Sequence, residues 1–148
     1  DGKLAQAVMS IHSVKGFEVG DGWRAAGLPG SQVHDAMAGG AERYGRSSNR
    51  AGGLEGGMTN GEELVVRAAV KPIATLMKPL PTIDVITHEP ADAARERSDV
   101  TAVPAASIVV LAMAALTLAD AFIDKFGGDT LDELRERLSA HRAYAAEY

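Results

Sequence analysis

The densest group of residues suited to ligand binding is the glycine segment, residues 49–61, with the sequence NRAGGLEGGMTNG. Five glycines surround one carboxylate, Glu55, and two polar side chains, Thr59 and Asn60. Glycine reaches backbone angles closed to other residues and lets a ligand lie against the main chain. Because ordering so many glycines costs conformational entropy, we expect a cradle for an anion or a flat cofactor, with an ordinary polar turn region as the alternative. The spacing fits neither a dinucleotide-binding fingerprint nor a Walker loop.

A second group, Lys71-Pro72-Ile73-Ala74-Thr75, combines a cation, a rigid turn and a hydroxyl, which suits contact with a phosphate. The alternative is a strand end that exposes a solvated lysine. Several cations lie near these two groups in the sequence: Arg46, Arg50, Arg67, Lys71 and Arg97. In an acidic chain they point to a multiply anionic ligand, provided that the fold brings them together.

A third group, Arg97-Ser98-Asp99, stands just before a long apolar segment. At a helix entrance an aspartate often caps the helix, and the arginine is then a surface partner. The functional alternative is a carboxylate that accepts a proton while Arg97 holds an anionic group.

Composition limits the classes of function. The chain has 148 residues, enough for one domain, and 46% hydrophobic residues, which is ordinary for a globular protein. Its net charge of −5 argues against a general nucleic-acid binder. Cysteine is absent and the four histidines (His12, His34, His88 and His141) are scattered, so we expect no metal site. The start at Asp1, without an initiator Met or an apolar leader, suggests a processed product or a fragment.

The first half of the chain predicts few regular elements. Residues 4–14 have apolar positions at helical spacing, and residues 17–19 alternate as a short strand before the turn at Asp21-Gly22. Residues 25–49 predict a long loop.

The second half predicts strands over residues 63–73 and 83–87, followed by an apolar helix over residues 102–126. The helix is interrupted by Pro104 and ends in acidic residues, and its uncharged part is shorter than the roughly 20 residues that cross a bilayer. We therefore expect a fully buried helix at the centre of a globular assembly, not a membrane span. Gly127-Gly128 should end it, and Asp129 or Thr130 should cap a last helix over residues 131–148, with Leu131, Leu134 and Leu138 on one face.

Four motifs, in order along the chain, resemble the chorismate synthase family: SIHSVKGFEVGDGW, SNRAGGLEGGMTNGEELVVRAAVKPIAT, ERSDVTAVPAA and LADAFIDKFGGD. The resemblance runs from about Lys3 to Asp129. It implies an α+β fold, with helices sandwiched between antiparallel sheets and assembled as a homotetramer. It also implies that residues 1–148 form the C-terminal portion of one domain. The family's N-terminal portion, with a GxSHG-type motif, a basic cluster and two acid histidines, has no counterpart here.

The resemblance implies an enzyme of the shikimate pathway. Members eliminate phosphate and a proton from 5-enolpyruvylshikimate 3-phosphate in a 1,4-anti sense to give chorismate, with reduced FMN and without net redox change. A cytoplasmic protein with no membrane or nucleic-acid partner is expected. Reduction of the flavin by a partner enzyme or by an intrinsic NADPH activity is left open. The alternative to a working enzyme is an inactive structural or assembly fragment that retains part of the flavin site.

Motif matching assigns roles to residues of this chain. Asp99 is the carboxylate for proton transfer at flavin N5, and the cofactor-binding residues are His12, Ser13, Gly56, Lys71, Pro72, Ile73, Ala74, Thr75 and Arg97. Two positions depart from the family pattern. Ala74 stands where relatives have serine, which removes one hydroxyl from the FMN phosphate site. Leu111 stands where many relatives have glutamate, which we interpret as packing.

Overall fold

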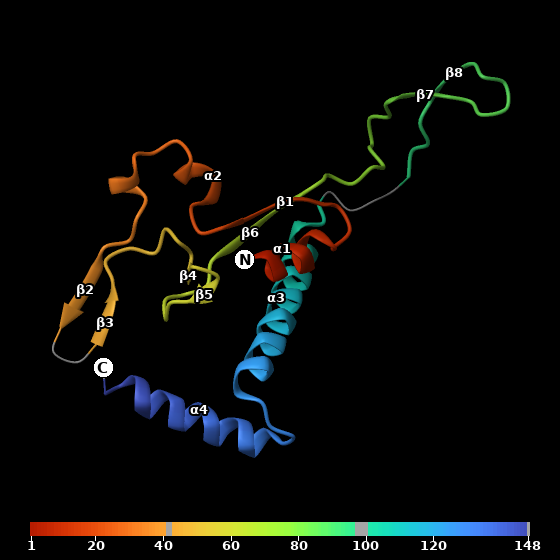
Figure 1. The fold of residues 1–148 in the computed structure, drawn as a ribbon. Coiled ribbons are helices and arrows are strands. Elements are labelled where there is room, and N and C mark those ends of the chain that lie inside the picture. The colour runs from red at the N-terminus through yellow and green to blue at the C-terminus, as the bar shows by residue number, and fades with distance from the viewer. Residues whose placement is uncertain (41–42, 97–100, 148) are drawn as a thin grey trace.

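The computed structural model describes residues 1–40, 43–96 and 101–147 (Figure 1). In chain order its elements are α1 (Gly2–Met9), β1 (Val14–Val19), α2 (Gly22–Ala25), the 3-10 helix η1 (Gly30–Gln32), β2 (Met37–Gly40), β3 (Arg43–Arg46), β4 (Leu54–Glu55), β5 (Met58–Thr59), β6 (Val66–Val70), β7 (Pro81–Ile83), β8 (Pro90–Asp92), α3 (Val103–Phe126) and α4 (Leu131–Ala145). Helices and antiparallel strands are mixed, as expected for an α+β fold.

One antiparallel ladder joins distant parts of the described chain. β1 pairs with β6, with Val14 opposite Val70 and Val19 opposite Val66, and a bulge interrupts the register between Val14 and Gly16. The other described strand pairs are local hairpins: β2–β3, β4–β5 and β7–β8. Figure 1 shows β7–β8 projecting away from the rest of the molecule. The β1–β6 ladder is therefore the frame that holds the remaining segments together.

A small apolar core lies where α1 meets α3 and the start of β1. Leu4 and Val8 are one helical turn apart on α1, so both face the same side. With Val14 and Ala114 they are the buried apolar side chains of the described residues. Lys3 adds ion pairs from α1 to Asp120 (3.6 Å) and Asp124 (3.5 Å) of α3.

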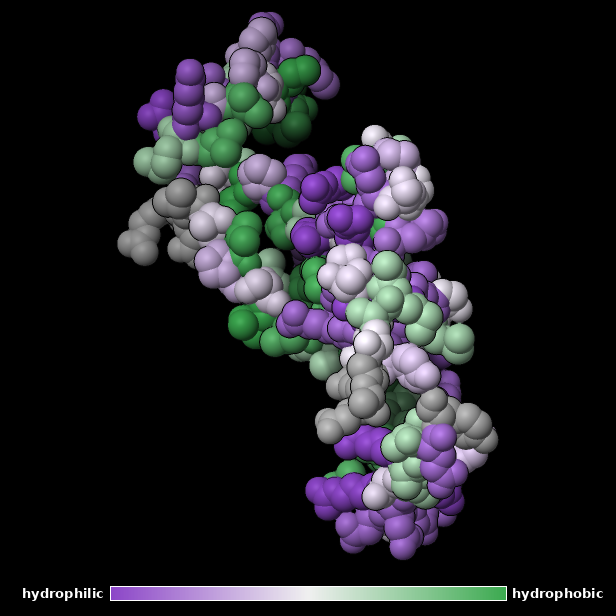
Figure 2. Space-filling view, turned by 90° about the vertical axis from the view of Figure 1, so that its left-hand side faces the viewer, coloured by the Kyte–Doolittle hydropathy of each residue, from purple (hydrophilic) through white to green (hydrophobic). Residues whose placement is uncertain are grey.

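Within this single chain α3 is largely exposed, so its burial at the centre of an assembly stays a prediction. Of the described residues of α3, Ala114 alone is buried, while Ile108, Leu111 and Leu116 are each 66% exposed. By length and composition the helix could cross a membrane, with 6% of its most apolar window buried. The reason for the exposure is geometric. α1 and β6 cover one side, and α4 runs away from the end of α3 without covering the others (Figure 1). Figure 2 accordingly shows hydrophobic residues at the surface.

The ends of α3 and the start of α4 match the prediction closely. α3 ends at Phe126, and its C-cap Gly127 has a φ of 61°, a value that glycine adopts at low cost. Thr130 is the N-cap of α4, and its hydroxyl accepts a hydrogen bond from the Glu133 N–H (3.3 Å). Thr130, not Asp129, is thus the capping residue.

Several predicted boundaries differ from the structure. α1 ends at Met9 and not at residue 14, and β1 extends from Val14 to Val19. The predicted loop over residues 25–49 contains the β2–β3 hairpin, whose glycine-rich strands lack alternating apolar residues. Residues 84–87 form a turn and not a strand, because the Asp84 carboxylate accepts the backbone N–H groups of Ile86 (2.8 Å) and Thr87 (2.9 Å).

Candidate functional site

The glycine segment folds as a tight hairpin. β4 pairs with β5, with Glu55 opposite Met58, so Gly56 and Gly57 form a two-residue connection. Their φ angles are 60° and 78°. Positive φ at both central residues is the geometry of a type I′ turn, which favours Gly-Gly. A Cβ placed at either glycine would meet no atom within 4 Å, so the tip of the hairpin is open to an approaching ligand.

The two preceding glycines have a packing role. A Cβ on Gly52 would lie 2.3 Å from the Gly20 nitrogen, and one on Gly53 would lie 2.6 Å from the Glu63 oxygen. Both positions also have positive φ, at 67° and 80°. Close backbone contact and turn geometry therefore account for these four glycines. Their number is not in itself a sign of a ligand, and the cradle remains a prediction.

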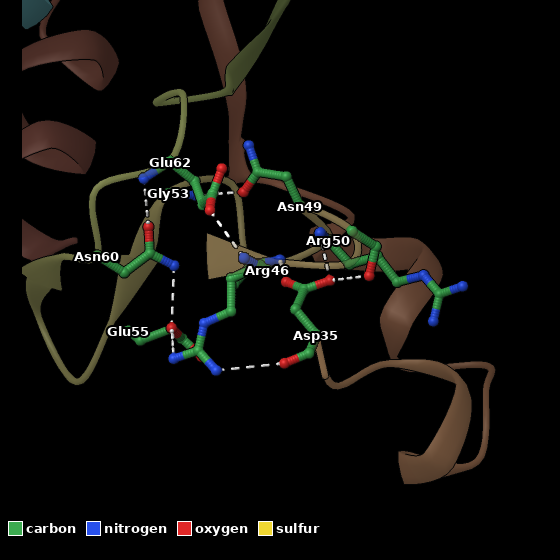
Figure 3. Close-up of polar contacts among 10 residues, drawn as sticks. Asp35, Arg46, Asn49, Arg50, Gly53, Glu55, Asn60 and Glu62 are labelled. Atoms are coloured by element: carbon green, nitrogen blue, oxygen red, sulfur yellow. Dashed lines mark hydrogen bonds and ion pairs between the residues drawn. The ribbon is translucent and has the colours of Figure 1, made fainter. Parts of the chain in front are cut away.

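Asp35 anchors the start of the glycine segment (Figure 3). Its side chain is buried, with 6% of the residue exposed. Its Oδ1 accepts hydrogen bonds from the Ser48 hydroxyl (2.5 Å) and the Arg50 N–H (2.9 Å), and its Oδ2 accepts one from the Ala51 N–H (2.8 Å). Burial raises the pKa of Asp35, but these hydrogen bonds and the Arg50 charge outweigh it and hold the pKa below its usual value.

The polar residues inside the segment mostly satisfy one another. Glu55, singled out by the sequence, forms an ion pair with Arg46 (2.7 Å) and accepts a hydrogen bond from the Asn60 side chain (2.9 Å). The Asn49 side chain accepts a hydrogen bond from the Gly53 N–H (2.8 Å) and donates one to the Glu63 carbonyl (2.7 Å). These side chains stabilise the hairpin, which gives Glu55 and Asn60 a structural role (Figure 3).

The arginines near the segment are likewise engaged within the chain. Arg46 binds Glu55, the Arg50 guanidinium donates to the Gln32 carbonyl, and the Arg67 guanidinium donates to the Gly20 carbonyl. These three cations therefore do not form the shared anion site that their sequence positions suggested. Arg50, Arg67 and Lys71 are all exposed. Of these three, Lys71 has a side chain that makes no hydrogen bond or ion pair with another described residue.

His12, Ser13 and Lys71 come together at one end of the β1–β6 ladder. The Lys71 N–H donates to the Ser13 carbonyl (2.7 Å), and Ser13 has a φ of 67°, which is uncommon outside glycine. The side chains of all three residues are exposed. Two motifs that lie far apart in the sequence, HS and KPIAT, thus form one surface, and Pro72, Ile73, Ala74 and Thr75 continue from it.

Gly56 belongs to the other end of the ladder. The Gly20 N–H donates to the Val65 carbonyl (2.9 Å), and the Val65 N–H donates to the Gly52 carbonyl (3.0 Å), which ties the glycine segment to that end. The ends of β1 are about 17 Å apart at the usual rise of a strand. A single ligand that contacts both groups must therefore be elongated.

Arg97 and Asp99 lie outside the described residues. α3 begins at Val103, and the Thr101 hydroxyl accepts the Val103 N–H (3.2 Å). Thr101 therefore satisfies one of the free N–H groups at the start of α3. Asp35, which organises the glycine segment, was missed by the sequence analysis because an aspartate inside a long loop has no distinctive spacing.

A broad groove runs between α1, α3, α4 and the β4–β5 hairpin. Its lining is largely apolar and includes two cations. Among the lining residues are Leu4, Leu54, Met58, Leu118, Phe122, Phe126, Leu138, Lys125 and Arg142.

Known proteins match this chain over its whole length. A family profile described as chorismate synthase matches residues 1–123. The chorismate synthase of Thermus thermophilus is 61% identical over 149 aligned residues, which cover 100% of this chain and 39% of that protein. The chorismate synthase of Moorella thermoacetica is 57% identical over 151 residues, which cover 99% and 39%.

A solved structure, the crystal structure of a chorismate synthase, superposes with a TM-score of 0.79 at 40% sequence identity. It covers 100% of this chain and 37% of the solved chain, and it confirms the expected fold class. The chain therefore spans less than half the length of the relatives it matches, and within that span sequence, profile and fold agree: it belongs to the chorismate synthase family.

Proposed function

We propose that residues 1–148 are the C-terminal portion of a chorismate synthase. The whole enzyme converts 5-enolpyruvylshikimate 3-phosphate to chorismate by 1,4-anti elimination of phosphate, with reduced FMN as cofactor. The observation that carries the proposal is the 61% identity to the Thermus thermophilus enzyme across the full length of this chain.

The arrangement of the chain's own residues suits an FMN site. The exposed Lys71 side chain, next to Ser13, can hold the dianionic phosphate of the flavin by a charge-assisted contact. The open backbone at Gly56 lets a flat ring lie against the main chain. The separation of the two groups along β1 suits an elongated molecule with a ring at one end and a phosphate at the other. Ala74 offers no hydroxyl at its position.

Proton handling is assigned to Asp99, with Arg97 holding an anionic group nearby. Reduced FMN, when bound, would supply electron density for the elimination. The task of the protein is to provide cations and N–H donors for the leaving phosphate and a base for the proton. His12 and Ser13 contact the flavin in this assignment.

The exposed surface of α3 is explained by the same proposal. A long helix that is apolar on all sides is buried in a large protein or in a membrane. The chain covers 39% of its Thermus relative, so most of that protein is available to cover α3, together with neighbouring subunits of a homotetramer. We therefore infer a cytoplasmic enzyme without membrane or nucleic-acid partners, consistent with a net charge of −5.

The alternative, an inactive assembly fragment, is favoured for the isolated chain by the same exposed helix. We expect purified residues 1–148 to show no turnover with substrate and reduced FMN under anaerobic conditions. Full-length Thermus thermophilus chorismate synthase is the positive control. Turnover above background by the isolated chain would show that the remaining part of the family protein is dispensable.

A hybrid enzyme tests the proposed function directly. In it, residues 1–148 replace the aligned segment of the Thermus thermophilus protein. We expect the hybrid to bind FMN and to form chorismate. A hybrid that folds and has the same oligomeric state as the Thermus enzyme, yet forms no chorismate, would contradict the proposal.

A further inference from the structure

We propose that Asp35 is a positioning residue that holds the glycine segment in the conformation that receives the flavin ring. The flavin part of this inference rests on the proposed function, whereas the positioning part does not. Asp35 lies more than a dozen residues before the segment, and among the described residues it forms no hydrogen bond with any that the motifs assign to the ligand. Its role follows from its contacts with the chain.

Both oxygens of the Asp35 carboxylate accept hydrogen bonds from one short stretch of chain, residues 48–51. Ser48, Arg50 and Ala51 donate to it from 2.5 to 2.9 Å, two of them through main-chain N–H groups. The Asp35 carbonyl adds an acceptor for the Arg46 guanidinium at 3.4 Å. A carboxylate accepts all three bonds because it carries no hydrogen of its own, whereas an amide would turn an N–H group toward one of these donors.

The anchored stretch leads directly into the hairpin. The Arg50 carbonyl accepts the Asp21 N–H (2.7 Å), which ties the stretch to the end of β1. The Asn49 side chain accepts a hydrogen bond from the Gly53 N–H, and the Gly53 carbonyl accepts one from the Asn60 N–H (3.0 Å). Each step is a hydrogen bond between neighbours, so the position of residues 48–51 determines the position of β4 and β5.

The hairpin depends on this anchor because it is too small to be stable alone. β4 and β5 pair over two residues each, and Met58 is 71% exposed at their tip. An isolated two-stranded hairpin is marginal in water even when it is longer. The conformation of Gly56 and Gly57 is therefore maintained by what holds residues 48–53.

The chain offers a matched control in Asp84. This carboxylate also accepts two backbone N–H groups, from Ile86 and Thr87, and its pKa is likewise lowered by those bonds. It lies in the β7–β8 hairpin, which projects away from the glycine segment (Figure 1). Asp84→Asn therefore makes the same chemical change at a place where the proposal predicts no effect on the segment.

Amide hydrogen exchange of the 148-residue chain tests the positioning role. In Asp35→Asn we expect the amides of residues 52–61 to exchange roughly tenfold faster, as for the loss of one good hydrogen bond. Asp84→Asn should leave them unchanged, and β1 and β6 should stay protected in both. Unchanged exchange of residues 52–61 in Asp35→Asn would overturn the inference whether or not the chain serves a flavin enzyme.

Ser48→Ala is a milder variant that tests the same contact if Asp35→Asn does not fold. It keeps the carboxylate and its two main-chain bonds but removes the hydroxyl donor. We expect it to accelerate exchange of the same amides by a smaller factor. Acceleration spread evenly over the whole chain would instead indicate global destabilisation and overturn the local role.

The hybrid enzyme tests the link to the flavin. Asp35→Asn should weaken the binding of FMN and of riboflavin by the same factor, roughly tenfold, because the hairpin faces the ring that both share. This pattern distinguishes Asp35 from a residue that contacts the FMN phosphate. Faster local exchange with unchanged affinity for both flavins would overturn the link to the flavin.

Discussion

Gly56 and Gly57 are neighbouring positions of one turn, so alanine at either one places a methyl group on a left-handed residue. Their φ angles are 60° and 78°, and no atom lies within 4 Å of a Cβ at either position. Each substitution therefore costs only the left-handed penalty of a non-glycine residue, about 1–2 kcal/mol. We expect both variants to lower the melting temperature of the chain alike, by roughly 2–4 °C for each kcal/mol.

The two variants should differ in the binding of FMN. If the flavin ring lies against Gly56, the methyl group of Gly56→Ala separates the ring from the main chain, whereas that of Gly57→Ala does not. In the hybrid enzyme, titration with FMN should show affinity weakened about tenfold or more for Gly56→Ala, a loss of about 1.4 kcal/mol. Gly57→Ala is the matched control. Equal FMN affinities for the two variants, at equal stability, would refute the assignment of Gly56 as the close-approach glycine.

Gly52→Ala tests whether the space around a glycine predicts the cost of adding a methyl group. Its Cβ would lie 2.3 Å from the Gly20 nitrogen, and its φ is 67°. Overpacking and the left-handed penalty together should cost about 2–5 kcal/mol. A Gly52→Ala variant that melts together with Gly57→Ala would show that the contact with Gly20 is looser than described, and the argument from open space at Gly56 would lose its basis.

Three further predictions concern single charged groups. Lys71→Ala in the hybrid enzyme should weaken FMN binding by roughly ten- to a hundredfold and leave riboflavin binding nearly unchanged, because only FMN carries the phosphate. Equal losses of affinity for both flavins would indicate damaged folding. Asp99→Asn should preserve the melting temperature and FMN affinity while lowering turnover by roughly a hundredfold or more, and near-normal turnover would leave a structural role only. The lowered pKa of Asp35 means that its bonds stabilise the fold above pH 3.8 and are lost as the pH falls through the lower folded value. The Ala51 amide proton, followed by NMR, should therefore titrate with a midpoint below 3.8, and a midpoint at or above 3.8 would contradict the hydrogen-bond assignment.

Features set by local chemistry could be predicted from the sequence. Gly127 ends α3 and Thr130 caps α4, because backbone freedom at glycine and a hydroxyl acceptor act within one turn of helix. The Gly-Gly sequence likewise favours the two-residue turn at Gly56-Gly57, whereas the stability of that turn depends on the contacts of residues 48–53. By contrast, His12-Ser13 and Lys71-Pro72-Ile73 lie at the same end of a ladder because β1 pairs with β6. Nothing in the sequence of either strand indicates which other strand it pairs with.

The structure also explains two differences between the chain and the expectations. The apolar pattern of residues 102–126 indicates burial but not the partner that provides it, and α1 and β6 cover only part of α3. The glycine-rich strands β2 and β3 bury no alternating side chains, so their pattern resembles a loop. Asp35 escaped notice because its importance lies in three donors that come from residues 13 to 16 positions later.

The β1–β6 ladder has a consequence for the order in which the molecule folds. The paired strands are separated by about 50 residues, and closing a loop of that length costs on the order of 3.5 kcal/mol of chain entropy. Helices α3 and α4 involve no such closure, so they should form first, and the ladder later. Pulse-labelled amide exchange during refolding should show protection of α3 before that of Phe17 and Ala68, which pair across the ladder. The pairing of β1 with β6 brings Lys71 to Ser13, so the candidate cofactor surface is among the last parts of the chain to form. A cofactor that binds there can therefore stabilise only molecules in which the ladder has already formed.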